Sequence, residues 1–459
     1  MYKMKNIHMV GIGGIGMSGI AEVLHNSGYT VTGSDIAENA TVQYLRQLGI
    51  KVYVGHKKEN INGAQIVVYS SAVKDGNEET DAARAALLPV VPRAEMLAEL
   101  MRPKYGISIA GAHGKTSTTA MIATILERAG FDPTIIIGGR LDSIGSTAKY
   151  GKGSFFVAEA DESDGSFLML SPAISVVTNI DREHLDFYND LPHIKDTFLQ
   201  FVNKVPFYGM IVLCSDDDNI REIMPRLKRE FCTYGLSNDA DMQAQDIKMH
   251  WLGSRYDLYF KNKLFGEITL TTPGIHTVYN SLAAISVALE LEVPFPLIQK
   301  GIEDFKGADR RFQIKGEVND ILVIDDYAHH PTEIETTLKA VRIGNKRRVL
   351  VVFQPHRYTR TMDLLPEFSA AFHDADVIIL TNIYSATEKP IPGIHAKSIM
   401  EGIKNNGKED LYFVEQVDEI SDLLLDIAKP GDIVVTLGAG NIWMAGEQFL
   451  EKMNHDQTC

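Results

Sequence analysis

A glycine-rich segment in the first third of the chain carries the residue types that grip a phosphate. Gly111-Ala112-His113-Gly114-Lys115-Thr116 follows an apolar run, Ile107–Ala110, and precedes a helical pattern, Thr118–Arg128. Glycines let backbone N–H groups approach phosphate oxygens, and the helix offers its positive end. Lys115 can then reach the β- and γ-phosphates and the Thr116 hydroxyl can bind Mg2+, so the segment predicts ATP binding. The usual pattern has a further glycine upstream that this chain lacks, so the match is to a shorter variant, Gly-x-x-Gly-Lys-Thr.

A second glycine loop lies near the N-terminus and suits a pyrophosphate. Ile7–Val10 leads into Gly11-Ile12-Gly13-Gly14-Ile15-Gly16 and then into a helical pattern over residues 17–26. The next expected strand, Thr30–Gly33, runs into Asp35, an acid placed for ribose hydroxyls. The same geometry serves NAD or any other nucleotide diphosphate. A simple dehydrogenase has no use for a second phosphate loop, so the presence of both loops disfavours NAD.

Metal-binding side chains follow two expected strands of the central region. Glu159-Ala160-Asp161-Glu162 ends one strand, and Asn179-Ile180-Asp181-Arg182-Glu183-His184 ends the next. Ligands collect at the carboxyl ends of strands in open parallel sheets, so both strings should face the phosphates of the central loop. Mg2+ is usually bound by one or two carboxylates together with substrate oxygens and water. The predicted metal ligands are Thr116, Glu159 and His184, with Glu162 as the alternative to Glu159.

Two further polar strings follow adjacent expected strands in the last third of the chain. Asp325-Asp326-Tyr327-Ala328-His329-His330-Pro331-Thr332-Glu333 opens a helix, and Gln354-Pro355-His356-Arg357-Tyr358-Thr359-Arg360 follows the next strand. Because so many polar side chains follow two adjacent strands, the sequence predicts that they line the bottom of a pocket. Arg357 and Arg360 suit a bidentate grip on a carboxylate. Arg310-Arg311 is either a charged linker or a pair that neutralises a transferring phosphoryl group.

Composition and charge narrow the classes of function. The 459 residues are 45% hydrophobic and 23% charged, as in ordinary globular proteins. The net charge of -15 disfavours nucleic acid as a main partner. We find no apolar run long enough to span a membrane and no signal-peptide pattern, so we expect a cytoplasmic protein without membrane insertion. Cys214, Cys232 and Cys459 lack metal-ligand spacing and are expected to be thiols.

Strand-like and helical runs alternate along the chain, which predicts an α/β fold of parallel sheets covered by helices. The length favours three domains. We expect their boundaries to give residues 1–103, 104–310 and 311–459, with a more β-rich stretch over residues 231–270.

Together these segments resemble the Mur ligase family of peptidoglycan synthesis over essentially the whole chain. The Asp-Asp-Tyr-x-His-His-Pro string is highly specific, whereas the first glycine loop alone is not. The resemblance is carried by Gly11 to Ser18, Gly111 to Thr116, Glu159 to Asp164, Thr178-Asn179-Ile180 with His184, Arg310-Arg311-Phe312, and Asp325 to Glu333.

The resemblance implies an ATP-dependent ligase with three domains. A Rossmann-like N-terminal domain would hold a UDP-sugar, a P-loop central domain would bind ATP and Mg2+, and a Rossmann-like C-terminal domain would bind an amino acid. Within the family the likeness points to the joining of L-alanine to the lactyl carboxylate of UDP-N-acetylmuramate through an acyl phosphate. The alternative is a murein-recycling ligase that attaches a preformed peptide to the same sugar. Both a monomer and a homodimer fit this expectation.

By the same resemblance, individual residues take family roles at the positions that match. Catalysis is implied for Lys115, Glu159, His184 and Arg311. ATP binding is implied for Gly111, Ala112, His113, Gly114, Lys115, Thr116, Ser117, His276, Asn280, Arg311 and Asp326. UDP-sugar binding is implied for Gly11, Gly13, Gly14, Gly16, Asp35, Ser70 and Ser71. Amino-acid binding is implied for Tyr327, His329, His330, His356, Arg357 and Arg360.

Two family features stay open in this sequence. Thr277 stands where an asparagine commonly follows the adenine-side histidine, which puts any role of that asparagine in doubt. Other members hold a second metal with a carbamylated lysine; Lys195 is nearby, without a motif that fixes it there. The candidates to take the proton of the incoming amine are His329, His330 and His356.

Overall fold

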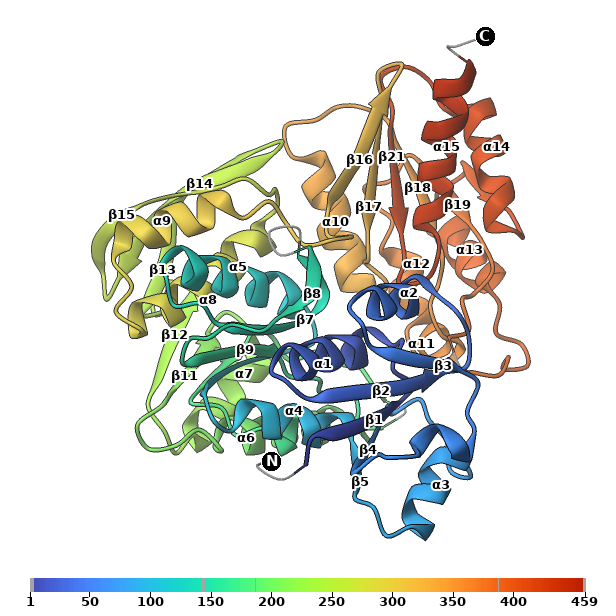
Figure 1. The fold of residues 1–459 in the computed structure, drawn as a ribbon. Helices are drawn as coiled ribbons and strands as arrows, with labels where there is room; N and C mark the ends of the chain where they lie inside the picture. Colours follow the sequence, from blue (N-terminus) through green and yellow to red (C-terminus); the bar gives the residue numbers. More distant parts are fainter. Residues whose placement is uncertain (1–3, 142–144, 186, 387, 457–459) are drawn as a thin grey trace. The chain divides into compact units, whose positions relative to one another are not determined.

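The structure of the chain is a computed structural model that describes residues 4–141, 145–185, 187–386 and 388–456. Three sheets follow one another along the chain (Figure 1). The chain forms two compact units. The first comprises the chain up to Asp246 with Asp257–Ile268 and Tyr279–Lys306, and the second comprises Ile247–Tyr256, Thr269–Val278 and the chain from Gly307 onward. The expected three-domain α/β fold is confirmed, whereas the exact domain boundaries stay a prediction.

The N-terminal sheet is parallel throughout, with the strand order β3-β2-β1-β4-β5. Its strands are β1 (Asn6–Val10), β2 (Thr30–Asp35), β3 (Lys51–Val54), β4 (Ile66–Tyr69) and β5 (Val90–Pro92). Its helices are α1 (Ile15–Asn26), α2 (Ala40–Gln47), α3 (Glu78–Ala85) and α4 (Arg93–Met101). The order reverses at β1, so the loop after β1 lies where nucleotides bind in such sheets.

The central sheet has ten strands in the order β15-β14-β13-β12-β11-β10-β6-β9-β7-β8. Its strands are β6 (Tyr105–Ala110), β7 (Thr134–Leu141), β8 (Ser146–Lys149), β9 (Phe155–Glu159), β10 (Ile174–Val177), β11 (Met210–Cys214), β12 (Phe231–Gly235), β13 (Met242–His250), β14 (Gly253–Phe260) and β15 (Lys263–Leu270). Its helices are α5 (Lys115–Arg128), α6 (Leu191–Val202), α7 (Asp218–Ile223), α8 (Ile275–Glu290) and α9 (Phe295–Asp304). Strand β6 pairs with β9 and β10, so the ends of these three strands meet.

The C-terminal sheet has the order β16-β17-β21-β18-β19-β20, with β16 antiparallel at its edge. Its strands are β16 (Gln313–Val318), β17 (Ile321–Asp326), β18 (Val349–Phe353), β19 (Val377–Leu380), β20 (Leu411–Phe413) and β21 (Ile433–Leu437). Its helices are α10 (Pro331–Arg342), α11 (Tyr358–Asp363), α12 (Leu365–Ala370), α13 (Ala396–Asn405), α14 (Val417–Ile427) and α15 (Trp443–Asp456).

Alternation along the strands of this last sheet builds a core on each face. Ile321 and Val323 of β17 join the cluster beneath α14 and α15, which pack side by side (Figure 1). Leu322 and Ile324 join the opposite cluster, which is lined by α10, α12 and α13. Successive side chains of a strand point to opposite faces, so a continuous apolar strand can bury both.

Helix starts and strand directions differ in detail from the sequence expectations. Helices α1 and α5 begin at Ile15 and Lys115, two or three residues earlier than expected, because Gly14 and Gly114 serve as their N-caps. The antiparallel pairs β7–β8 and β16–β17 were not foreseen, since the alternation of strands and helices predicts parallel pairing.

The sequence predicts that the cysteines are thiols and that no segment spans a membrane. Cys214 is buried and Cys232 half-buried, and both are free thiols, whereas Cys459 lies outside the described residues. No helix in the described part of the chain combines the length and apolarity needed to cross a bilayer.

Candidate functional site

The central glycine loop joins β6 to α5 through two backbone conformations that favour glycine. Gly111 has a φ of 135° and Gly114 a φ of 81°. A Cβ on Gly111 would collide with Thr178 Oγ1, and one on Gly114 would lie 2.6 Å from Asn280 Oδ1. Glycine therefore lets the loop turn tightly against the end of β10 and against α8. The contact also places Asn280, which was expected to bind ATP, beside the loop.

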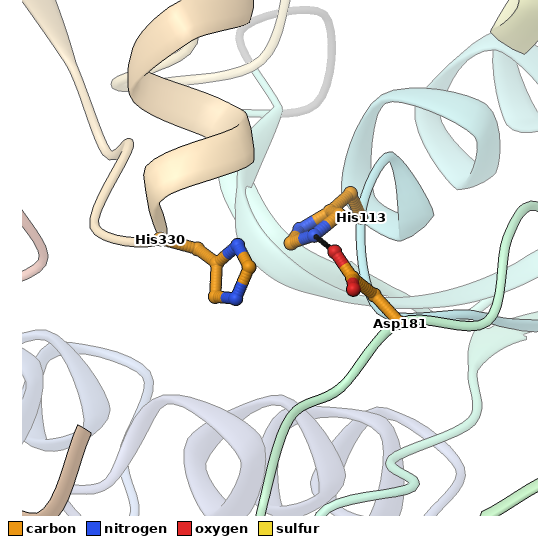
Figure 2. A group of neighbouring side chains, drawn as sticks. All are labelled: His113, Asp181 and His330. Carbon is orange, nitrogen blue, oxygen red and sulfur yellow. Dashed lines mark hydrogen bonds and ion pairs between the residues drawn. The ribbon is translucent and has the colours of Figure 1, made fainter. Parts of the chain in front are cut away.

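The end of β10 anchors the same loop through side chains. Asn179 accepts from the His113 amide at 2.8 Å and donates to the His113 carbonyl at 2.9 Å, and Thr178 Oγ1 donates to that carbonyl at 2.5 Å. The His113 ring lies 3.0 Å from Asp181 Oδ2, the contact drawn in Figure 2. These contacts fix the conformation of the loop backbone.

Lys115 curls back over its own loop. Its Nζ donates to the carbonyls of Gly111 at 2.5 Å and Ala112 at 3.1 Å, and to Glu162 Oε1 at 2.7 Å. Burial works to lower the pKa of Lys115, but the carboxylates of Glu162, Glu183 and Asp161 together outweigh it and raise the pKa. Lys115 is therefore a fixed positive charge at the start of α5.

Glu162 is the buried acid of this group. Its side chain is 5% exposed, and its Oε2 makes no hydrogen bond with any described residue. Burial raises its pKa to about 7, and the Lys115 charge opposes that rise only in part. The backbone carbonyl of Glu162 accepts from the hydroxyl of buried Tyr188 at 2.5 Å, which fixes the turn after β9.

Two more residues complete what we call the Lys115 centre, namely Lys115, Glu162, Glu183 and His184. His184 Nε2 lies 3.7 Å from Glu162 Oε1 and 3.8 Å from Glu183 Oε2. Glu162, Glu183 and His184 each offer one possible ligand atom, and these three atoms lie within 4.8 Å of one another, a spacing that suits one metal ion. His184 has a φ of 55°, in a region that non-glycine residues rarely adopt and that often marks functional sites.

The structure separates the two candidate glutamates. Glu159, the last residue of β9, accepts from the Gly138 amide of β7 at 2.7 Å. Glu162 instead contacts Lys115 and His184. Thr116 lies in the first turn of α5 and is almost fully buried. Glu183 was missed; its place next to His184 was the one signal that could have singled it out.

The N-terminal loop is closed by residues that were expected to bind the UDP-sugar. The Gly13 amide donates to Asp35 Oδ2 at 2.8 Å. Asp35 thus faces the loop backbone in this structure. A Cβ on Gly11 would lie 3.0 Å from Ser70 Cβ, so the end of β4 touches the loop. Gly14 and Gly16 open α1, and Ser71 is exposed.

A buried polar cluster lies beneath this loop. Glu79, fully buried, accepts from Ser34 Oγ and from Asn60 Nδ2 (2.6 Å), and lies 3.3 Å from His56 Nδ1 and 3.6 Å from His8 Nε2. Burial alone would raise the pKa of Glu79, but the nearby His8 ring and hydrogen bonds from Ser34 and Asn60 hold it at about 2. The Ser34 carbonyl accepts from the Gly11 amide at 2.8 Å, so the cluster supports the loop directly.

In the second compact unit, which we call the C-terminal unit, the two adjacent arginines have different surroundings. Arg310 donates to buried Asp325 at 2.9 Å and to the carbonyls of Gly438 and Gly440 at 2.6 and 3.0 Å. It therefore ties the ends of β17 and β21 together. Arg311 Nη1 lies 3.6 Å from Glu333 Oε1, and its guanidinium carbon lies 5.2 Å from the centre of the Tyr327 ring.

Asp326 and His276 share the electrostatic field of Arg311. Asp326 accepts from the amides of Phe312 and Ala328, both at 2.8 Å. Burial raises the pKa of Asp326 to about 6, with the Arg311 charge opposing. Burial lowers the pKa of His276 to about 4, and the same charge adds to that effect. Neutral His276 is thus a ring that can stack on or hydrogen-bond a base.

The histidines of the expected amino-acid site gather around α10 and α11. His330 caps α10 by accepting from the Thr332 amide, and Glu333 completes the capping box. The ring of His329 lies 5.6 Å from that of His356, and His356 lies 3.2 Å from the guanidinium of Arg360. The structure thus brings these side chains together within the C-terminal unit.

Arg357 also belongs to this group by position. It has a φ of 70°, and its amide donates to Tyr384 O at 2.9 Å. Glu388 accepts from the amides of Tyr358 and Thr359 at 2.7 and 3.1 Å, which holds the start of α11. The bidentate grip expected of Arg357 and Arg360 stays a prediction.

Comparison with known families and proteins gives matches along the whole chain. Residues 6–105 match the Mur ligase family catalytic domain, residues 109–288 the Mur ligase middle domain, and residues 310–440 the Mur ligase glutamate ligase domain. A UDP-N-acetylmuramate–L-alanine ligase of Geotalea uraniireducens is 58% identical over 99% of both chains. That of Geotalea daltonii is 56% identical over 98% of both.

Solved structures give the same picture. A UDP-N-acetylmuramate-alanine ligase from Thermotoga maritima superposes with a TM-score of 0.85 at 30% identity, over 98% of this chain and 99% of that one. A murein peptide ligase from Psychrobacter arcticus superposes with a TM-score of 0.74 at 25% identity, over 98% of both chains.

Proposed function

Because the chain belongs to the Mur ligase family and joins L-alanine to UDP-N-acetylmuramate with ATP, we propose that the Lys115 centre is where that reaction is driven. In the proposed reaction the sugar's carboxylate attacks the γ-phosphate of ATP, which gives an acyl phosphate and ADP. The amine of L-alanine then displaces phosphate through a tetrahedral intermediate. The observation that carries the assignment is the contact of a phosphate-loop lysine with a buried acid beside a histidine.

Charge decides the first step. A carboxylate and a triphosphate repel each other, so the site must supply positive charge where they meet. Lys115 supplies it from a fixed position on the loop, and the start of α5 adds the positive end of the helix dipole. Arg311 is a further candidate for this role in the C-terminal unit.

The Lys115 centre also fits a divalent cation. Glu162 Oε2 is a buried oxygen that lacks a hydrogen bond with any described residue, and His184 Nε2 lies 3.7 Å from the second carboxylate oxygen, Oε1. We propose that Glu162, His184 and Thr116 bind Mg2+ together with phosphate oxygens and water. When bound, Mg2+ would neutralise charge on the γ-phosphate and make it more electrophilic. The sequence favoured Glu159, whereas the contacts favour Glu162.

We assign the remaining predicted residues to the same reaction. The loop from Gly11 to Gly16, with Ser70, would hold the pyrophosphate of the sugar nucleotide. His276, Asn280 and Asp326 would hold the nucleoside of ATP. The residues proposed for L-alanine are Tyr327, His329, His330, His356, Arg357 and Arg360. Cytoplasmic location and the choice between monomer and homodimer stay predictions from sequence.

The relatives do not favour the recycling alternative. Two relatives named for L-alanine are 56% and 58% identical to this chain, whereas the murein peptide ligase structure is 25% identical. We therefore expect L-alanine to be the better acceptor.

The acyl phosphate can be tested by following oxygen. UDP-N-acetylmuramate labelled with 18O in its carboxylate should give one labelled oxygen in the released phosphate, because that oxygen bridges carbon and phosphorus in the acyl phosphate and leaves with phosphorus. Mass spectrometry of the phosphate reads the outcome. Unlabelled phosphate would contradict the proposed route.

The metal ligand can be tested with Glu162→Gln and its matched control, Glu159→Gln. Loss of one charged ligand should weaken Mg2+ binding by about 1.5–3 kcal/mol, or roughly tenfold to a hundredfold. We expect this rise in the Mg2+ concentration for half-maximal rate in Glu162→Gln and a much smaller one in Glu159→Gln. The reverse order would return the ligand to Glu159.

A further inference from the structure

Arg93 links the N-terminal loop to the Lys115 centre inside the first compact unit. It is the first residue of α4, and its Nη2 lies 2.6 Å from Asp161 Oδ2 in the segment after β9. The Arg93 side chain is 19% exposed and that of Asp161 43%. The pair therefore joins the helix layer of the N-terminal sheet to the residue that precedes Glu162.

The other side of the Arg93 guanidinium lies against the N-terminal loop, residues 11–16, which we call the sugar-nucleotide loop. A Cβ on Gly16 would lie 2.6 Å from Arg93 Nη1, so the glycine leaves the space that the guanidinium occupies. Gly16 is the second residue of α1, at the helix end that the loop presents to a pyrophosphate. A fixed positive charge here adds to the field of that helix end.

Asp161 carries the link onward to the acid of the Lys115 centre. Its Oδ1 accepts from the Ser163 amide at 3.1 Å, and its carbonyl accepts from Phe167 at 3.2 Å. These bonds shape the turn that holds Glu162. Partial burial would raise the pKa of Asp161, but the Arg93 charge and the Ser163 contacts hold it at about 2.

We propose that Arg93 is a positioning residue that couples occupation of the sugar-nucleotide loop to the geometry of the Lys115 centre. The inference rests on the proposed function in one respect, that the loop from Gly11 to Gly16 binds UDP-N-acetylmuramate. Movement of the loop on binding would shift the guanidinium against Gly16, and Asp161 would transmit that shift to the turn carrying Glu162. Coupling of this kind is reciprocal, so ATP binding must change the affinity for the sugar by the same factor.

The coupling is measured directly by calorimetry on the full chain. UDP-N-acetylmuramate is titrated with and without a saturating non-hydrolysable ATP analogue and Mg2+, and the ratio of the two affinities is taken. Couplings of this kind typically give ratios of about 5–150. We expect the wild-type ratio in that range and a ratio within about twofold of one in Arg93→Ala and Asp161→Asn.

Matched variants separate coupling from folding. Arg102→Ala removes an arginine from the C-terminal end of the same helix, where it pairs with Glu99, and should keep the wild-type ratio. Arg93→Lys keeps the charge but loses the planar fork, so it should restore the ratio in part. Asp161→Asn keeps the shape of the turn and covers the case in which Arg93→Ala unfolds.

Three results would overturn the proposal. These are a wild-type ratio near one, an unchanged ratio in both Arg93→Ala and Asp161→Asn, or an equal loss in Arg102→Ala. A wild-type chain that does not bind UDP-N-acetylmuramate at all would instead count against the proposed function.

Discussion

Glu79→Gln is expected to lower the free energy of unfolding of the N-terminal sheet by about 3 kcal/mol at pH 7. The pKa of Glu79 falls from 4.5 to about 2 in the folded chain. Each pKa unit corresponds to about 1.4 kcal/mol, so the ionised carboxylate contributes about 3 kcal/mol to stability. Glutamine keeps the size of the side chain and one acceptor oxygen but removes the charge that His8, Ser34 and Asn60 stabilise.

The sign of the pH dependence follows from the lowered pKa. The contribution is fully present above pH 4.5 and is lost as the pH falls through about 2, because the folded carboxylate then takes up a proton. The stability difference between wild type and Glu79→Gln should therefore shrink over that window. The wild type is the chain that loses stability there.

Hydrogen exchange followed by mass spectrometry measures the stability of individual segments, so it can follow the N-terminal sheet separately in a chain of several domains. Peptides covering β1 and β2 should exchange roughly a hundredfold faster in Glu79→Gln at pH 7, the equivalent of about 3 kcal/mol. Glu78→Gln, at the exposed neighbouring position of α3, should leave exchange unchanged. Equal protection of wild type and Glu79→Gln at pH 7, or a difference that persists at pH 2, would refute the reasoning.

Two other predictions concern the central glycine loop and the C-terminal unit. Lys115→Ala should abolish turnover while calorimetry shows nearly unchanged binding of UDP-N-acetylmuramate, because the two loops serve different ligands; equal loss of both affinities would sink that separation. Arg310→Ala should destabilise the C-terminal unit by about 3 kcal/mol, the lower end for a broken buried ion pair, since the buried Asp325 carboxylate loses its ion-pair partner but keeps the hydrogen bond from the Thr436 hydroxyl. Urea unfolding measures the loss, and Lys339→Ala, which removes an exposed pair, should cost under about 1 kcal/mol.

Much of the fold follows from local pattern. The expected strands over 321–324 and 377–380 match β17 and β19, because continuous apolar runs between helices are typical of strands buried on both faces. The glycine loops were placed by their position between a strand and a helix. Edge pairings such as β7–β8 depend on which strands meet in space, which a single sequence does not specify locally.

The sequence predicted which segments form the candidate site, but not which side chains of those segments contact one another. Strand ends brought Glu159, Glu162 and His184 to one edge of the sheet, as parallel topology requires. Which glutamate faces Lys115 depends on the turn after β9, where Tyr188 and Asp161 hold the backbone. Such tertiary contacts leave no trace in spacing or periodicity.

Phosphate release from ATP, measured with UDP-N-acetylmuramate and a panel of acceptors, tests the central claim most directly. Turnover should require both the sugar nucleotide and L-alanine, with glycine and L-serine slower by about 1–3 kcal/mol, or roughly 10- to 200-fold in kcat/KM. A tripeptide acceptor that supports faster turnover than L-alanine would contradict the account and favour the recycling ligase.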